Sequence, residues 1–144
     1  MTELHALLIP VGEDVYALDA ASVREVVGEP VATRVPMTPP WMLGIFNLRG
    51  EVVPLFDTAA MIGIGRTPSV SFVAVVTTSG GPAGLVVSGL PKVAVLTEQA
   101  GPSDLRATRG LYLIDDGVAV LIDVEAMLVA QHGDSSIDVR GLAS

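Results

Sequence analysis

The feature that most constrains this chain is a pattern that occurs twice. Gly44–Asp57 reads GIFNLRGEVVPLFD, and Gly110–Asp123 reads GLYLIDDGVAVLID in the same register without a gap. In each copy an apolar run leads into a tight polar turn, a second apolar run follows, and an Asp at the end can start a helix. Each copy therefore predicts a β-hairpin followed by a helix, and the recurrence predicts two similar folding units.

The similarity between the two halves extends upstream of this pattern. Leu18 aligns with Leu85 and Val23 with Leu90, so apolar positions coincide although identities are few. Two copies are too few for a solenoid, because arrays generally need about three or more repeats to bury a core. We therefore expect two small, pseudo-equivalent β-barrels that share an apolar seam, with room for strands to exchange between the halves at the ends.

Length and composition fit one domain with a mainly β fold. The chain has 144 residues, half of them apolar but only 4% aromatic, so its core must consist of Val, Leu, Ile and Ala. The net charge of −8 and the single lysine, Lys92, leave no basic stripe that could bind nucleic acid. The absence of cysteine fits a reducing cytoplasm, and the acidic N-terminus is not typical of a secretory signal.

A long uncharged stretch between Arg66 and Lys92 raises the question of a membrane span. Pro68, Pro91 and the central TTSGGP divide it into two short apolar runs, which is typical of a hairpin rather than of an unbroken helix. We therefore expect no membrane insertion. Val31–Val35 is also expected to be a strand, ahead of a rigid Pro-rich connection.

Two aspartates occupy matching positions in the two copies and could be interpreted as paired carboxylates. Asp57 precedes a short run that ends at Gly63, and Asp123 precedes a longer helical run that is expected to end at Gly133. An Asp directly before such a run usually caps its helix and stabilises it by ~1 kcal/mol. We interpret both as structural caps, with residues 133–144 as a flexible tail.

Signals for catalysis or for a cofactor are weak. His5 and His132 have no Asp, Glu or His at the spacing of metal ligands. There is no G-x-S-x-G nucleophile motif, and the segments GIGRTP and SGGPAG lack the lysine of a phosphate-binding loop. The sequence therefore predicts no enzyme, no cofactor and no metal.

Three other residues indicate contacts with a partner. Arg49 lies at the tip of the first hairpin, where the second copy has Asp115, and it is either an exposed turn charge of little energetic weight or a contact for a carboxylate. Leu90 and Val93 flank a Pro-Lys pair, and they belong either to the core or to an apolar surface for a protein partner.

Several of these segments together resemble CheW, the coupling protein of bacterial chemotaxis arrays. The resemblance runs from Leu7 to Val129 and includes GED, YALD, VREV, PWMLGIFNLRGEVVPLFD, GLVVSGLPKV and VAVLIDVEAML. Its most specific part is the NLRG-x-V-x-P-x-x-D pattern from Asn47 to Asp57. The resemblance implies two five-stranded SH3-like barrels packed on a hydrophobic seam, with short helices and a C-terminal helix. Subdomain 1 would cover about residues 6–66 and subdomain 2 about residues 67–132.

The resemblance also implies a non-catalytic adaptor that couples the cytoplasmic tips of chemoreceptors to the histidine kinase CheA. The receptor-binding positions correspond here to Val23, Glu25 and Arg49, and the kinase-binding positions to Leu90 and Val93. Such an adaptor can act through weak interfaces repeated in a lattice, so we expect it to be monomeric alone and recruited to membrane-associated arrays.

Two other functions remain open at this point. One is a CheW-like scaffold for a signalling kinase outside chemotaxis, such as one that controls twitching motility. The other is a small-ligand module in the groove between the barrels around Arg49, which would require a deep polar pocket with convergent titratable groups.

Overall fold

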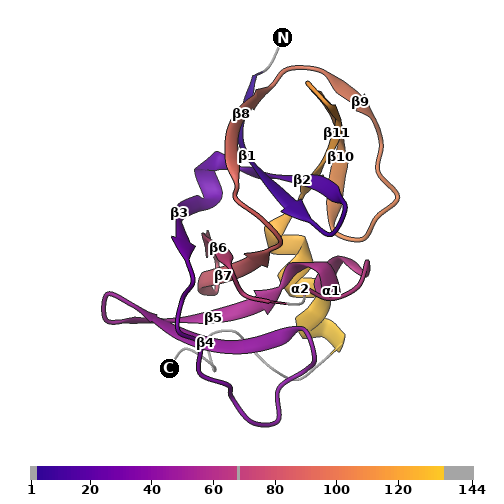
Figure 1. Cartoon of the computed structure of the whole chain (residues 1–144). Coiled ribbons are helices and arrows are strands. Elements are labelled where there is room, and N and C mark those ends of the chain that lie inside the picture. The colour runs from indigo at the N-terminus through magenta and orange to yellow at the C-terminus, as the bar shows by residue number, and fades with distance from the viewer. Residues whose placement is uncertain (1–2, 68, 135–144) are drawn as a thin grey trace.

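A computed structural model describes residues 3–67 and 69–134, and Figure 1 shows two curled β-sheets, one above the other, with helices beside their junction. The strands are β1 (Leu4–Val11), β2 (Asp14–Asp19), β3 (Val23–Gly28), β4 (Met42–Leu48), β5 (Glu51–Asp57), β6 (Phe72–Thr78), β7 (Gly81–Val87), β8 (Lys92–Leu96), β9 (Gln99–Gly101), β10 (Thr108–Ile114) and β11 (Gly117–Ile122). The helices are the 3-10 turn η1 (Ala20–Ser22), α1 (Thr58–Ile62) and α2 (Val124–Asp134). The predicted mainly β fold is confirmed.

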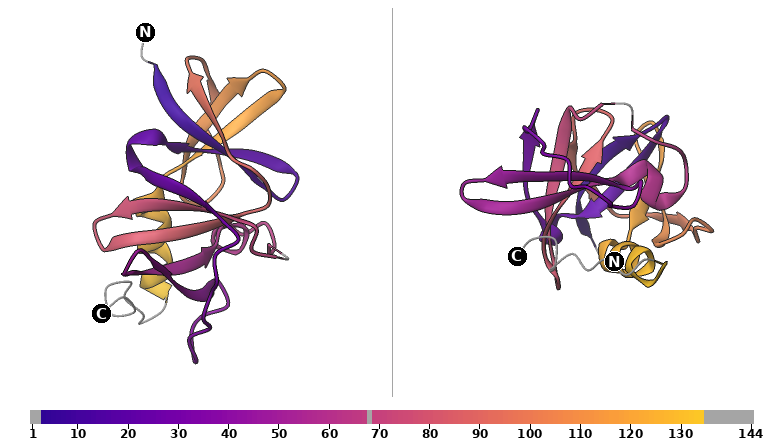
Figure 2. Two further views of the ribbon diagram at one scale, coloured as in Figure 1. Left: turned by 60° about the vertical axis from the view of Figure 1, so that its left-hand side comes forward. Right: turned by 90° about the horizontal axis from the view of Figure 1, so that it is seen from below.

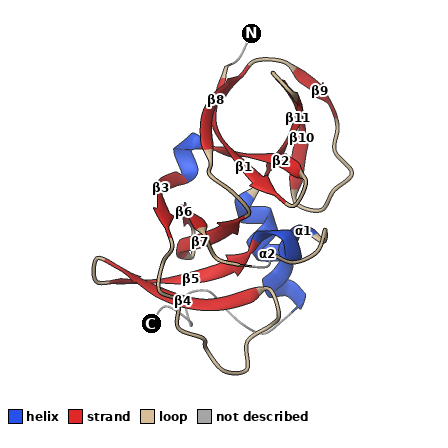
Figure 3. Ribbon diagram, viewed as in Figure 1, coloured by secondary structure: helices blue, strands red, loops and turns tan. Residues whose placement is uncertain are grey.

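Each sheet contains strands from both halves of the chain. One sheet has the order β8-β1-β2-β11-β10-β9 and is called the terminal barrel, and the other has the order β3-β6-β7-β5-β4 and is called the central barrel (Figure 3). The halves thus exchange a whole hairpin, β1–β2 for β6–β7. The expected boundary near residue 66 therefore does not separate the two sheets. The terminal barrel has six strands rather than five because the short β9 extends it.

The two barrels repeat the same strand register. Leu55 lies opposite Gly84 in the parallel pair of β5 and β7, and Leu121 lies opposite Ala17 in the parallel pair of β11 and β2. These positions are equivalent in the sequence repeat. The recurrence seen in the sequence is therefore a recurrence of fold, completed by exchange of the hairpins.

The glycine that begins each copy of the repeat lies where the strand register shifts. Gly44 has φ 147° and Gly110 has φ 129°, which other residues rarely adopt. A Cβ atom at Gly44 would lie 2.4 Å from the carbonyl oxygen of Thr33. Thr33 forms an isolated bridge with Ile45, and the strand predicted over Val31–Val35 is otherwise absent from the structure. That prediction was wrong: Pro30 and Pro36, which have no backbone N–H to donate to a strand ladder, flank the segment, and within it only Thr33 pairs.

Three apolar clusters stabilise the fold. The interior of the central barrel contains Phe46, Leu48, Val53, Leu55, Val73, Val75 and Val86. The interior of the terminal barrel contains Ala6, Leu8, Ala17, Leu96, Ala119 and Leu121. The largest cluster joins both barrels to α1 and α2 and includes Ile9, Tyr16, Leu18, Phe56, Met61, Leu85 and Met127. It is the predicted hydrophobic seam, and α2 runs from it along the central barrel (Figure 2).

Both predicted helix caps are confirmed. The Asp57 carboxylate accepts a hydrogen bond from the backbone N–H of Ala60 at 3.4 Å, and Gly63, with φ 82°, is the C-cap that follows the last residue of α1. The Asp123 carboxylate accepts one from the N–H of Ala126 at 3.0 Å. The second helix passes the predicted end at Gly133 by one residue, and the remainder of the predicted tail, 135–144, lies outside the described residues.

The uncharged stretch between Arg66 and Lys92 forms the predicted hairpin, with β6 and β7 antiparallel from the Phe72–Val87 pair to the Thr78–Gly81 pair. Within residues 3–67 and 69–134, the structure contains no helix that is long and apolar enough to cross a membrane.

Candidate protein-interaction surfaces

The turn between β4 and β5 holds Arg49 on the rim of the central barrel. The Asn47 side chain accepts a hydrogen bond from the N–H of Gly50 at 2.7 Å, and Arg49 adopts φ 51°. Its guanidinium binds the Glu25 carboxylate of β3 through both terminal nitrogens, and the Nη1–Oε2 distance is 3.2 Å. This bidentate geometry fixes the direction of both side chains more firmly than a lysine could.

The electrostatics of this pair are those of a surface interaction. The hydrogen bond from Arg49 holds the pKa of the Glu25 carboxyl below its ordinary value, and the charges of Arg49 and Arg24 act in the same direction. The same bond raises the pKa of Arg49. The Arg49 side chain is 68% exposed and that of Glu25 is 28% exposed, so the pair contributes little stability but presents a fixed charge pattern to solvent.

A second ion pair lies beside the first. Arg24 of β3 contacts Glu51 of β5 at 2.9 Å. Because β3 is one end of the five-stranded sheet and the β4–β5 hairpin is the other, the two ion pairs bridge the ends of the sheet and close the central barrel. Neither pairing was predicted from the sequence.

The three residues predicted to bind a receptor are only partly brought together. Glu25 and Arg49 are in direct contact. Val23 begins the same strand as Glu25, but it is half-buried and packs against the hydrophobic seam. Any contact through Val23 would therefore lie at the edge of the seam rather than on the charged rim.

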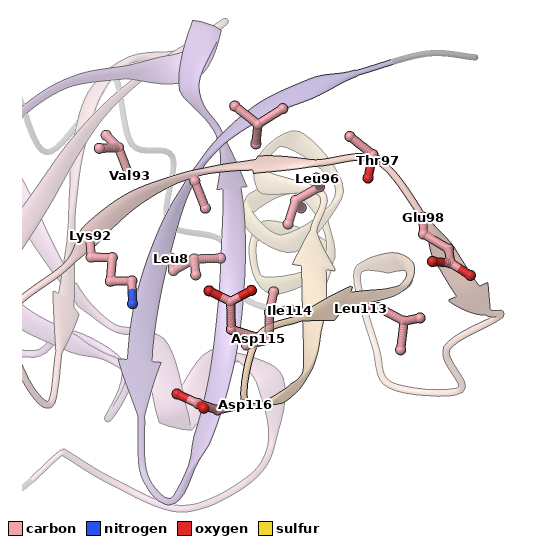
Figure 4. A pocket seen from close by; sticks show the side chains of 12 residues that line it. Leu8, Lys92, Val93, Leu96, Thr97, Glu98, Leu113, Ile114, Asp115 and Asp116 are labelled. Atoms are coloured by element: carbon pink, nitrogen blue, oxygen red, sulfur yellow. The ribbon is translucent and has the colours of Figure 1, made fainter.

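Leu90 and Val93 lie on the terminal barrel and are exposed. Their exposed fractions are 70% and 79%, so both residues belong to the surface and not to the core. Leu90 lines a hollow of about 190 Å³ with Pro10 and Val118. Val93 lines a neighbouring hollow of about 460 Å³, which we call the β8 groove (Figure 4). The apolar residues thus surround a depression and do not fill the core.

The β8 groove also carries charges that sequence reasoning missed. Lys92 lies on one wall, and Asp115 and Asp116 of the β10–β11 turn lie across from it (Figure 4). When the two halves of the sequence are aligned, Lys92 is equivalent to Glu25 and Asp115 is equivalent to Arg49. The alignment of the halves contained this signal, because both residues of the ion pair are reversed in sign in the second copy.

The three hollows have unlike linings. A third, of about 120 Å³, lies near Arg109 and Glu125, and the Glu125 carboxylate there accepts hydrogen bonds from the N–H and hydroxyl of Ser79 at 2.7 and 2.9 Å. Arg49 lines none of these three hollows, and its side chain is mostly exposed. Among the described residues, no group of three or more His, Cys, Asp or Glu side chains could hold a metal ion.

Two fused barrels with unlike exposed surfaces, one charged and one apolar around a groove, define a protein-interaction module. Comparison with known proteins identifies which one: the CheW-like domain model matches residues 5–132, and the chain belongs to that family.

Relatives and a solved structure agree with this assignment. The chain is 34% identical over 136 residues to the probable chemotaxis protein CheW of Rhizobium etli, covering 88% of each. It is 29% identical over 137 residues to the chemotaxis protein CheW of Klebsiella aerogenes, covering 88% of this chain and 82% of the relative. The crystal structure of the scaffolding protein TtCheW from Thermoanaerobacter tengcongensis superposes with a TM-score of 0.76 at 26% identity, over 88% of this chain and 93% of that one.

Proposed function

We propose that this protein is a non-catalytic adaptor that couples the cytoplasmic tips of chemoreceptors to the histidine kinase CheA in a bacterial chemosensory array. The family match over residues 5–132 supports a chemotaxis adaptor. The observation that carries the proposal is that the two barrels share a fold but differ at equivalent surface positions. An adaptor needs this property, because it must hold two different partners at once.

The receptor-facing surface in this proposal consists of Glu25 and Arg49 with Val23 beside them. A bidentate ion pair on a barrel rim presents a donor and an acceptor at fixed positions, which selects the register of a partner more than it adds affinity. Val23 would supply a small apolar contact at the edge of the seam.

The kinase-facing surface consists of Leu90 and Val93. Exposed apolar side chains around a depression are typical of the central anchors of a protein interface. In a membrane-associated array, both surfaces would be occupied at once by different partners.

A binding experiment with purified CheA regulatory domain from the same genome tests the kinase-facing surface. Replacing both residues, Leu90→Asp with Val93→Asp, is expected to abolish capture of that domain. Val129→Asp is the matched control, because Val129 is 64% exposed on α2, outside the proposed surface. Capture that survives the double substitution, or that is lost equally in the control, would contradict the assignment.

Charge exchange tests the receptor-facing surface. Arg49→Glu alone is expected to weaken co-sedimentation with receptor arrays and also to repel Glu25. The double variant Glu25→Arg with Arg49→Glu restores an internal ion pair in reversed order. If receptors bind this double variant as well as they bind the wild type, the pair has only a structural role.

A further inference from the structure

The β8 groove follows the free edge of a strand. Strand β8 is the first in the order of the terminal sheet, and among the residues that the structure describes it pairs only with β1. Every residue from Lys92 to Glu98 lines the groove, including neighbours whose side chains point to opposite faces. The groove therefore runs along the backbone of β8, for about 16 Å at 3.3 Å per residue over its five residues.

The edge of β3 in the central barrel is equivalent to the edge of β8 in the terminal barrel. Ion pairs bridge the gap beside β3, whereas no described ion pair bridges the gap beside β8. The ion pairs among the described residues are Arg24–Glu51 and Arg49–Glu25, both across the central gap. Lys92 faces carboxylates across the terminal gap and belongs to neither pair. One backbone hydrogen bond, from the N–H of Leu113 to the carbonyl of Glu98 at 2.9 Å, joins β10 to the end of this segment.

This open edge is poorly protected by the usual devices. Exposed edge strands normally carry charges or prolines that prevent another strand from pairing with them. Beyond Lys92 at its start, β8 continues as Val93, Ala94, Val95 and Leu96, and Val93 and Val95 are 79% and 49% exposed. An edge of this kind is a template for an added strand.

We propose that an extended, basic segment of a partner protein adds to the free edge of β8 and fills the groove between β8 and the β10–β11 turn. The proposal rests on the kinase-facing surface proposed above, and it specifies what that surface binds. Backbone hydrogen bonds to β8 would provide affinity, and alternate apolar side chains would contact Val93, Val95 and Leu113. A lysine or arginine of the segment would lie against Asp115 and Asp116.

The charges of the groove and of the whole chain favour a basic segment, rather than a second copy of the chain, as the occupant of the groove. The groove has three carboxylates, Glu98, Asp115 and Asp116, and a single ammonium, Lys92. The whole chain carries a formal charge of −8. Two copies would repel each other on approach, whereas a basic segment would be attracted.

A titration followed by ¹H–¹⁵N NMR tests the proposal with a defined probe. The peptide acetyl-Val-Arg-Val-Arg-Val-amide is expected to cause saturable shifts in the amides of Lys92–Leu96 and to slow their hydrogen exchange. The peptide acetyl-Val-Glu-Val-Glu-Val-amide should bind at least tenfold more weakly. A third peptide, identical to the first but N-methylated at alternate residues along one edge, keeps the side chains and should lose strand addition.

A pair of substitutions tests the role of charge in the groove. Asp115→Asn with Asp116→Asn should weaken binding of the basic peptide roughly tenfold, at about threefold for each exposed carboxylate. The control is Glu13→Gln, which neutralises an exposed carboxylate in the β1–β2 turn. Both variants change only charge at turn positions, so they are expected to keep the fold.

Each outcome of these titrations has a definite meaning. Equal binding of acidic and basic peptides, or shifts that avoid β8, would overturn the proposal. Concentration-dependent shifts of β8 in the protein alone would show that a second copy occupies the groove, and would also overturn it. If the basic peptide binds but the CheA regulatory domain does not, the groove is supported and the proposed function fails. If the domain binds but the peptide does not, only the groove proposal fails.

Discussion

The two helix-capping aspartates allow the effect of burial on stability to be measured within one chain. Asp57 is buried and Asp123 is only half-buried, so Asp123 serves as the control. Asp57 is 1% exposed, and beyond its cap it accepts hydrogen bonds from the N–H of Thr67 at 3.1 and 3.2 Å and from its hydroxyl at 2.9 Å. Asp123 is half-buried and caps its helix at Ala126. The two residues occupy the same place in the repeat, so they differ in surroundings rather than in local fold.

Replacing each aspartate by alanine should therefore have unequal costs. A lost cap costs about 1 kcal/mol, which is the expected effect of Asp123→Ala. At Asp57 the hydrogen bonds from Thr67 to a charged acceptor are lost as well, and these are worth about 1.5–3 kcal/mol. We expect Asp57→Ala to lower the free energy of unfolding by about 2.5–4 kcal/mol.

Urea denaturation followed by the fluorescence of Trp41 measures this difference. Trp41 is the single tryptophan, and its ring packs on Phe56, next to Asp57, with 5.8 Å between ring centroids. A double-mutant cycle with Thr67→Val should give a coupling energy of about 1–2 kcal/mol with Asp57. Equal costs for the two alanine variants, or no coupling with Thr67, would refute the idea that burial and the Thr67 contacts distinguish Asp57.

The central barrel gives three further predictions. The Glu25 carboxyl should titrate below the ordinary glutamate range in an NMR pH titration, and Arg49→Gln should raise its pKa toward that range. Because the folded pKa of Glu25 is lowered, the small stabilisation from the ion pair is present at neutral pH and is lost as the pH falls through that pKa. Gly84→Ala should destabilise by about 1–3 kcal/mol in urea melts, because the new Cβ atom would lie 2.8 Å from two buried side chains, whereas the equivalent Ala17 is accommodated. Gly44→Ala should cost about 3 kcal/mol or more, because it meets backbone at 2.4 Å, and a smaller cost than at Gly84 would contradict this ranking.

Local features of the fold could be predicted from the sequence because they depend on neighbouring residues. The hairpins follow from apolar runs separated by turn residues, and the caps at Asp57 and Asp123 follow from a carboxylate placed before a helical run. The hairpin exchange could not be predicted in detail. Apolar patterns identify a strand, but they do not say which of two similar sheets receives it.

The candidate surfaces were predictable only where a residue broke the repeat. Arg49 differs in sign from Asp115, and this difference was visible in the sequence. Leu90 and Val93 were not assignable from composition, because the same residue types build the core. It could not be predicted that Arg49 pairs with Glu25, or that Lys92, the residue equivalent to Glu25, is in neither described ion pair. Such a prediction requires knowing which strands lie at the ends of the sheets.

The exchange of hairpins has a consequence for synthesis on the ribosome. Strand β2 emerges early, but Val15 pairs with Ala119, near the end of the described chain. Strands β3 to β7 can complete their sheet while translation continues, since all five are consecutive in the chain. The N-terminal hairpin must wait for β8 and β11, with an apolar face uncovered in the meantime. The newly made protein therefore depends on the last strands to protect the first, and a ribosome stalled before β11 would release a chain with one finished barrel and one exposed hairpin.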